Sequence, residues 1–164
     1  SYPELGAVGP LLLYEDDSIQ HQGMSFRQLQ EFGNWYFGHH PGKGLQRGAV
    51  GGLQKCISIT GACMLMERAL AQRVHGFDEA YAIGDFEDSD LCLRLYRMGL
   101  GCAVDLDVHL YHLERKSQAV SGHNWRMNLT LFNAWFHQRR WARAIAAHPL
   151  TLNTVPFPVQ GSTP

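Results

Sequence analysis

Four carboxylates fall within six residues of this 164-residue sequence, in the segment 84–91, which reads GDFEDSDL. The segment stands immediately before an apolar pattern with helical spacing. Helix capping explains part of the cluster, because Asp88 or Ser89 can accept hydrogen bonds from the free N–H groups of a first helical turn. The helix dipole also favours acids there. Capping accounts for one or two of the four acids and leaves Asp85 and Glu87 as crowded like charges.

General-base catalysis is the chemistry that such a carboxylate offers. At a helix N-terminus it is held in one orientation, and the dipole and N–H donors are expected to keep it ionised near neutral pH. It can then take a proton from a hydroxyl nucleophile, while a neighbouring acid binds sugar hydroxyls. A calcium-binding EF-hand loop is a poor fit, because position six counted from Asp85 is Asp90 instead of glycine.

Two of the nine histidines lie close together downstream, in the segment 109–112, which reads HLYH. On a strand, successive side chains point to opposite faces, so His109 and His112 face opposite ways. The pair therefore does not predict a shared metal site. His112 is singled out by its place at the end of a strand that we expect beside the acidic helix.

Alternating β and α patterns must position these residues. Apolar and β-branched runs predict strands or extended pieces at 6–14, 19–26, 55–60, 64–66, 102–104 and 108–111, with a turn at 105–107. Helical spacing predicts helices at 67–74, 91–98 and 124–147, and a short helix within 27–37. The glycine-rich segment 39–52 is predicted to be a long loop that orders over a substrate, and 151–164 a surface arm.

Composition and charge narrow the class of protein. The 14 Lys and Arg residues against 15 Asp and Glu residues give a net charge of −1, which argues against a nucleic-acid partner bound through its phosphates. No apolar run approaches the roughly 20 residues that cross a bilayer. The four cysteines form no C-x-x-C pair, and we expect buried thiols in a reducing compartment. The length suits one α/β domain.

Several blocks of the sequence together resemble the C-terminal half of family 2 glycosyltransferases of the GT-A fold. The blocks are 60–64 (TGACM), 76–79 (GFDE), 86–94 (FEDSDLCLR), and His112 with Ser117; residues 8–23 resemble the segment after the family's metal-binding DxD motif. Their order and spacing are specific, although any one alone is weak. The resemblance implies a partial GT-A-like mixed sheet flanked by helices over residues 1–147, without the N-terminal nucleotide-binding half. A proline-containing tail is expected over 148–164.

The resemblance implies an inverting transfer of a sugar from a nucleotide-sugar donor to an acceptor hydroxyl, with a Mn or Mg ion holding the donor diphosphate. By motif, Asp88 matches the catalytic base, and Glu87 matches a partner that positions the substrate. His112 matches the histidine that completes the metal site in some members. The acceptor is expected to be a glycan or a lipid-linked sugar, and the location cytoplasmic.

The same resemblance assigns residues to substrate binding. Gly61 and Ala62 match the strand end that lines the sugar pocket, where small residues let the donor approach the backbone. Asp85 and Arg94 are predicted to add substrate contacts. If these assignments hold, the Gly61 strand end, the acidic cluster and His112 must share one cleft, since ligands bind at the carboxyl ends of strands in α/β folds. Capping alone predicts no such convergence.

Two alternatives remain open at this point. Without the nucleotide-binding half, the segment alone is expected to be inactive, and it could be a non-catalytic module that binds carbohydrate or self-associates through an exposed sheet face. The aromatic and arginine-rich pattern at 124–147 fits a core helix with a basic outer face. It also fits a helix that rests on an anionic membrane surface, which would make the protein peripheral to the membrane.

Overall fold

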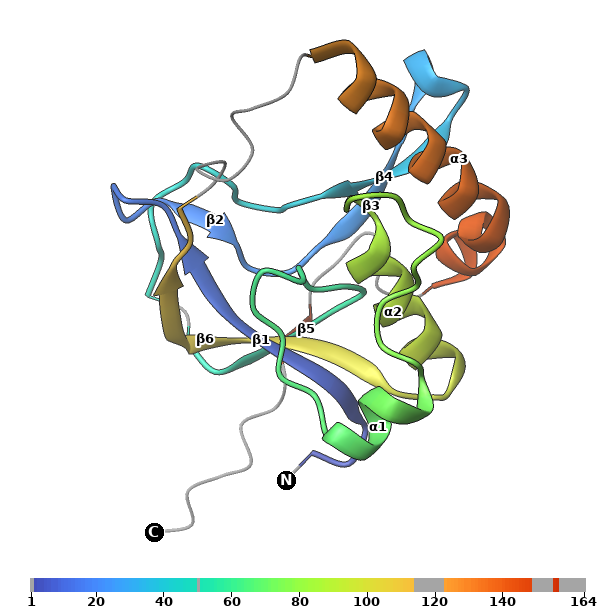
Figure 1. Ribbon diagram of the computed structural model, residues 1–164. Coiled ribbons are helices and arrows are strands. Elements are labelled where there is room, and N and C mark those ends of the chain that lie inside the picture. The colour runs from blue at the N-terminus through green and yellow to red at the C-terminus, as the bar shows by residue number, and fades with distance from the viewer. Residues whose placement is uncertain (1, 50, 114–122, 149–154, 157–164) are drawn as a thin grey trace, which may run out of the picture.

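A five-stranded mixed sheet forms the centre of the fold in the computed structural model, which describes residues 2–49, 51–113, 123–148 and 155–156 (Figure 1). The strands, in the order in which they pair, are β2 (Ile19–His21), β1 (Leu5–Leu13), β6 (Gly101–Tyr111), β5 (Leu53–Cys56) and β7 (Val155–Pro156). β1 and β6 are parallel, and the other pairs are antiparallel. The expected mixed α/β fold, with helices against a mixed sheet, is confirmed.

The central pair β1 and β6 contains a bulge close to the position where we expected a turn. We expected two strands separated by residues 105–107, but β6 is one strand. Pro10 on β1 lies opposite Asp105, and the next residue, Leu11, lies opposite His109, so three residues of β6 bulge out between them. Proline cannot donate a ladder hydrogen bond, and its place at the register shift fits that limit.

A β-hairpin occupies the segment for which we expected a short helix, so that prediction is wrong. Its strands are β3 (Ser25–Leu29) and β4 (Trp35–His39), joined through the single-turn 3₁₀ helix η1 (Gln30–Phe32). Gly33 and Asn34 both take left-handed conformations, with φ of 65° and 60°. These two residues allow the sharp reversal, and the aromatic run that follows has the composition of a strand.

Three helices complete the described part of the fold. They are α1 (Arg68–Arg73), α2 (Glu87–Arg97) and α3 (His123–Ala147). α2 lies against β1 and β6 and buries Leu91 and Leu95 there, while α3 packs across α2 and β4 (Figure 1). α2 begins four residues before the predicted start at Leu91, and three of the four acids therefore lie in its first turn.

The remaining expectations have mixed outcomes. Cys56, Cys92 and Cys102 are buried thiols, as expected; Cys63 is half-buried, and none of the four is in a disulfide. In the predicted surface arm, the described residues 155–156 form β7 at the sheet edge. The rest of that arm, and Ser117, lie outside the described residues. None of the helices described has the length and apolar character needed to cross a membrane.

Candidate active site

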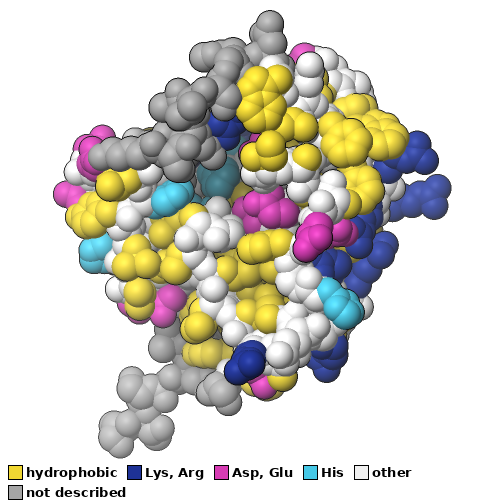
Figure 2. Space-filling view, viewed as in Figure 1, with side chains coloured by type: hydrophobic (Ala, Val, Ile, Leu, Met, Phe, Trp, Pro, Cys, Tyr) yellow, Lys and Arg dark blue, Asp and Glu magenta, His cyan; other side chains and the backbone are white. Residues whose placement is uncertain are grey.

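A cavity of about 350 Å³ brings together three of the predicted site residues. Asp85 and Asp88 line it from the start of α2, and His112 lines it from the end of β6. Figure 2 shows a hollow in this face bordered by acidic, histidine and basic side chains. The start of α2 and the end of β6 therefore meet at one cavity, as the resemblance required, whereas Gly61 does not line it. Gly61 instead donates its N–H to Asp88. The remaining predicted residues, Glu87, Ala62 and Arg94, do not line the cavity either.

Two backbone N–H groups hold the carboxylate of Asp88. The N–H of Gly61 donates to Oδ2 at 3.0 Å, and the N–H of Ser89 donates to Oδ1 at 2.6 Å. We expected the helix start to keep this acid ionised near neutral pH. Burial raises the pKa of Asp88 more than its N–H donors lower it. A raised pKa makes the carboxylate a stronger base, which suits proton abstraction near neutral pH.

Close packing leaves little room for a side chain at Gly61. A Cβ placed on Gly61 would lie 3.2 Å from the ring of Phe77 and 3.4 Å from the Cβ of Asp88. The absence of a side chain therefore lets the chain come close enough to donate its N–H to Asp88. Ala62 is exposed beside this turn, and its N–H donates to the hydroxyl of Thr60 at 3.3 Å. Neither residue lines the described cavity.

A run of four left-handed residues leads into α2. Residues 83–86 all have positive φ, between 63° and 124°, and three of them are not glycine. Such conformations cost free energy and persist only where the surroundings impose them. The fully buried amide of Asn133 on α3 supplies that support, because it accepts from the N–H of Ala82 and donates to the carbonyls of Ala82 and Gly84.

One turn earlier on α3, Thr130 fixes the carboxylate that faces the cavity. Its hydroxyl donates to Oδ2 of Asp85 at 2.6 Å. One turn beyond Asn133, the buried His137 contacts the hydroxyl of Ser89 at 3.2 Å. These α3 side chains lie on one face of the helix, and together they hold the loop before α2 in place.

Glu87 is half-buried and carries an unfavourable charge. Its Oε2 atom has no hydrogen-bond partner in the described structure. Burial raises the pKa of Glu87, and the nearby charges of Asp88 and Asp85 raise it further. This carboxylate therefore costs stability when it is ionised, which is typical of groups kept for function.

Replacing Glu87 by Gln is expected to raise the thermal unfolding midpoint at pH 7. The folded-state pKa of Glu87 lies above the unfolded value of about 4.3, so ionisation penalises the folded state more as pH rises through the folded pKa. The gain should therefore shrink on acidification and vanish below about pH 4. Thermal melts from pH 4 to pH 8 measure it, with the exposed Glu31→Gln as control. A gain that is the same at all pH values would contradict this origin.

His112 is clamped by Gln20 of β2. The imidazole Nδ1 lies 2.7 Å from Oε1 of Gln20, and the amide Nε2 of Gln20 donates to the carbonyl of His112 at 3.0 Å. An amide oxygen only accepts hydrogen bonds, so Nδ1 of His112 must carry the proton. Nε2 of the neutral ring then keeps its lone pair. Metal-binding histidines commonly donate their other ring nitrogen to a carbonyl in this way.

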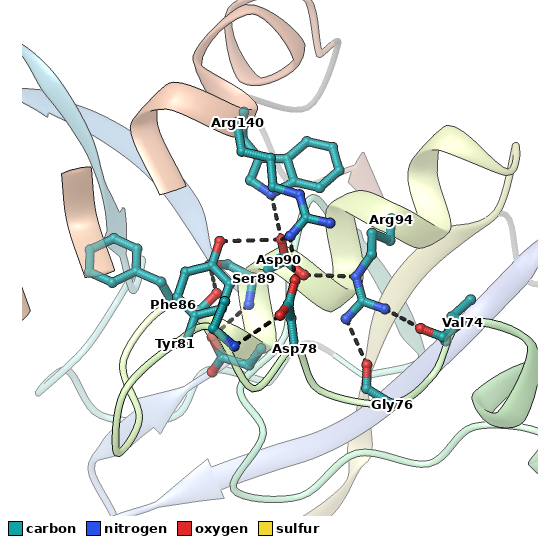
Figure 3. Close-up of polar contacts among 12 residues, drawn as sticks. Val74, Gly76, Asp78, Tyr81, Phe86, Ser89, Asp90, Arg94 and Arg140 are labelled. Atoms are coloured by element: carbon teal, nitrogen blue, oxygen red, sulfur yellow. Dashed lines mark hydrogen bonds and ion pairs between the residues drawn. The ribbon is translucent and has the colours of Figure 1, made fainter. Parts of the chain in front are cut away.

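Arg94, predicted to bind substrate, is engaged elsewhere. Its guanidinium pairs with Asp90 at 2.7 Å, donates to the carbonyl of Gly76 at 2.6 Å and also donates to the carbonyl of Val74 (Figure 3). These contacts join α2 to the segment after α1, and Arg94 is not part of the cavity wall. These partners fit a structural role, and the predicted substrate contact of Arg94 stays a prediction.

Asp90 is the centre of the same network and is fully buried. Its Oδ1 atom accepts from the indole of Trp141 at 2.7 Å and from the hydroxyl of Tyr81 at 3.2 Å, and it pairs with Arg140 at 3.1 Å. Trp141 and Arg140 belong to α3, so this one carboxylate ties α2 to α3 (Figure 3). The first turn of α2, which carries Asp88, is thereby held against α3 and against the segment after α1.

Sequence reasoning missed several residues of the cavity. The cavity is also lined by His21, His40 and Lys43, together with Gln20 and Phe37. Gln20 and His21 fall in the block that resembles the segment after the DxD motif, yet no spacing or motif assigned them a role. His40 and Lys43 lie in the predicted glycine-rich loop. The loop thus contributes to the cavity wall, but its predicted ordering over substrate stays a prediction.

Comparisons with known proteins give two distant relatives. Over 143 residues the chain is 27% identical to the O-antigen biosynthesis protein RfbC of Myxococcus xanthus, covering 81% of this chain and 11% of that protein. Over 119 residues it is 31% identical to the uncharacterized protein y4gI of Sinorhizobium fredii (strain NBRC 101917 / NGR234), covering 71% of this chain and 13% of that protein. The chain thus spans about an eighth or less of the length of these relatives. No family model matches the chain.

Proposed function

We propose that this chain is the acceptor-side, base-bearing portion of an inverting glycosyltransferase that uses a nucleotide-sugar donor. The observation that carries the proposal is the shared cavity of Asp88 and His112, each held in a defined state by its own hydrogen-bond partners. The relative RfbC is named for O-antigen biosynthesis, and O-antigen is a polysaccharide. That similarity supports a role in assembling cell-envelope glycans.

In the proposed reaction, Asp88 takes the proton from the acceptor hydroxyl as its oxygen bonds to the anomeric carbon. The bond from that carbon to the donor diphosphate breaks, and its electron pair leaves with the diphosphate. The second carboxylate, Asp85, is held by Thr130 at the same wall and can accept hydrogen bonds from sugar hydroxyls. Glu87 stays a proposed partner that acts through Asp88, because it is adjacent to the base and outside the cavity wall.

A divalent Mn or Mg ion fits this site in part. Nε2 of His112 is a suitable ligand atom, since Gln20 fixes the proton on Nδ1. The described residues contain no group of three metal ligands, so the other ligands would come from the donor diphosphate or from outside these residues. When bound, such an ion would offset the charge that develops on the leaving diphosphate.

The proposal is tested by donor turnover in the full-length protein. A panel of nucleotide-sugars is incubated with Mn²⁺ and lipid-linked or polysaccharide acceptors, and nucleoside diphosphate release is measured. We expect release from one donor that depends on both the acceptor and the metal ion. Release of equal size without any acceptor would indicate hydrolysis, and the absence of release from every donor would argue against a transferase.

A non-catalytic module is the second candidate, and one observation favours it. Val108, Leu110, Tyr111 and Leu113 at the end of β6 are each about half exposed. An apolar strand end of this kind can pack against another part of a longer protein or against a second copy. In this alternative, glycans bind the chain, but no donor sugar is turned over.

A further inference from the structure

We propose that His21 is a positioning residue that holds His40 in the tautomer with its proton on Nε2, and that His40 donates this N–H to a substrate oxygen in the cavity. The proposal rests on the proposed function for the identity of the substrate. The tautomer itself is inferred from the hydrogen bonds of His21 and His40, which are 19 residues apart in sequence.

The contacts of His21 fix its own proton. His21 is buried, and its Nε2 accepts from the backbone N–H of Gly23 and from that of Thr60, each at 3.3 Å. A ring nitrogen that accepts hydrogen bonds carries no proton. Neutral His21 must therefore carry its proton on Nδ1. Burial is the largest cause that lowers the pKa of His21, to about 3, so the ring is neutral at physiological pH.

The proton on His21 then fixes the state of His40. The two Nδ1 atoms lie 3.0 Å apart, and the rings meet edge to face with 5.2 Å between their centroids. Because His21 donates from Nδ1, Nδ1 of His40 must accept, and the proton of His40 lies on Nε2. A proton on Nδ1 of His40 would bring two N–H groups face to face, so the pair disfavours that tautomer. His40 lines the cavity that Asp88 and His112 share.

His21 also contacts the turn that holds Asp88. Two neighbouring residues of this turn donate their backbone N–H groups to different side chains. Thr60 donates to His21, and Gly61 donates to Asp88. His21 therefore contacts both the turn that holds the proposed base and the ring of His40. The charged and titratable groups around it are His40 and Lys43 from the loop after β4 and, beyond the turn, Asp88.

The tautomers are read directly by NMR, without any substrate. The 164-residue chain is labelled with ¹⁵N-histidine, and long-range ¹H–¹⁵N spectra are recorded at pH 7.5 with each ring assigned through its backbone. We expect protonated Nδ1 and unprotonated Nε2 for His21, and the reverse for His40. A His40 ring with its proton on Nδ1, or two rings in the same tautomer, would overturn the proposal.

Amide replacements test what the tautomer does in the full-length enzyme. The amide of Gln can place an N–H donor near the position of ring Nε2, whereas the amide of Asn lies near Nδ1. His40→Gln should keep the wild-type KM within about twofold, and His40→Asn should raise one substrate's KM roughly tenfold with little change in kcat, as expected for one lost hydrogen bond. The KM that rises identifies which substrate supplies the oxygen.

Two variants of His21 separate its role as donor to His40 from its packing. His21→Asn keeps a donor near Nδ1 and should raise KM less than His21→Gln, which keeps an acceptor for Gly23 and Thr60 but loses that donor. The exposed His109→Gln is the matched control and should change neither constant. Equal KM values for His40→Asn and wild type would overturn the proposed donation.

The failures of the two proposals are distinguishable. If the NMR tautomers are as expected and no nucleotide-sugar is turned over, the positioning by His21 stands and the transferase proposal fails. If sugar transfer is found and the tautomers differ, the transferase proposal stands and the role of His21 fails.

Discussion

Asp88→Asn is expected to lower kcat/KM for sugar transfer by about 10²–10⁴-fold in the full-length protein, the usual contribution of a general base. The amide cannot take the acceptor proton, yet its oxygen can still accept the N–H of Gly61 or Ser89. Donor binding and the far-UV circular dichroism spectrum should therefore be retained. Nucleoside diphosphate release at saturating donor measures the loss.

Two further variants sharpen that result. Asp16→Asn, at an exposed turn where the acid accepts from Ser18, is the matched control and should leave transfer unchanged. Asp85→Asn distinguishes the two cavity carboxylates. If Asp85→Asn removes transfer while Asp88→Asn retains activity within a few-fold of wild type, the base is Asp85 and our assignment of Asp88 is wrong.

Asp90→Ala is expected to lower the free energy of unfolding by about 3–5 kcal/mol, as found when one partner of a buried ion pair is removed. The change leaves Arg94 without its carboxylate and takes the acceptor away from Trp141 and Tyr81. Since a domain is stable by about 5–15 kcal/mol in total, this variant should be close to unfolding at 37 °C.

Urea unfolding followed by tryptophan fluorescence measures this loss, and Trp141 itself reports on the network. The exposed Glu79→Ala, in the segment between α1 and α2, serves as control and should stay within about 0.5 kcal/mol of wild type. A loss of less than about 1 kcal/mol for Asp90→Ala would mean that the network adds little to the cohesion of α2 and α3.

Local patterns predicted much of the fold. The apolar run of β1 and the spacing of Leu91 and Leu95 on α2 follow from residues that face one core, so periodicity is enough to find them. The hairpin β3–β4 was missed, because its polar and aromatic residues have no clear period. Its existence depends on a turn at Gly33 and Asn34 and on packing against α3.

The cavity wall was predictable where an acidic motif and a helix start coincide, as at Asp88. The motif also suggested Arg94, but besides Asp90 its partners are backbone carbonyls from another segment, and no sequence pattern specifies such contacts. His21 and His40 were beyond reach for a related reason. They meet only because the hairpin between them brings the chain back, and that hairpin had been interpreted as a helix.

The two N–H donors to Asp88 also bear on what happens after each proposed transfer. A protonated carboxyl accepts hydrogen bonds less strongly than a carboxylate, so taking the acceptor proton would weaken the grip on the Gly61 N–H. Loss of that proton to solvent would restore it. The hydrogen bonds between Asp88 and the turn beside it would thus weaken and strengthen once per catalytic cycle. Because the stronger hydrogen bonds form only with the ionised carboxylate, they would favour release of the proton before the next acceptor binds.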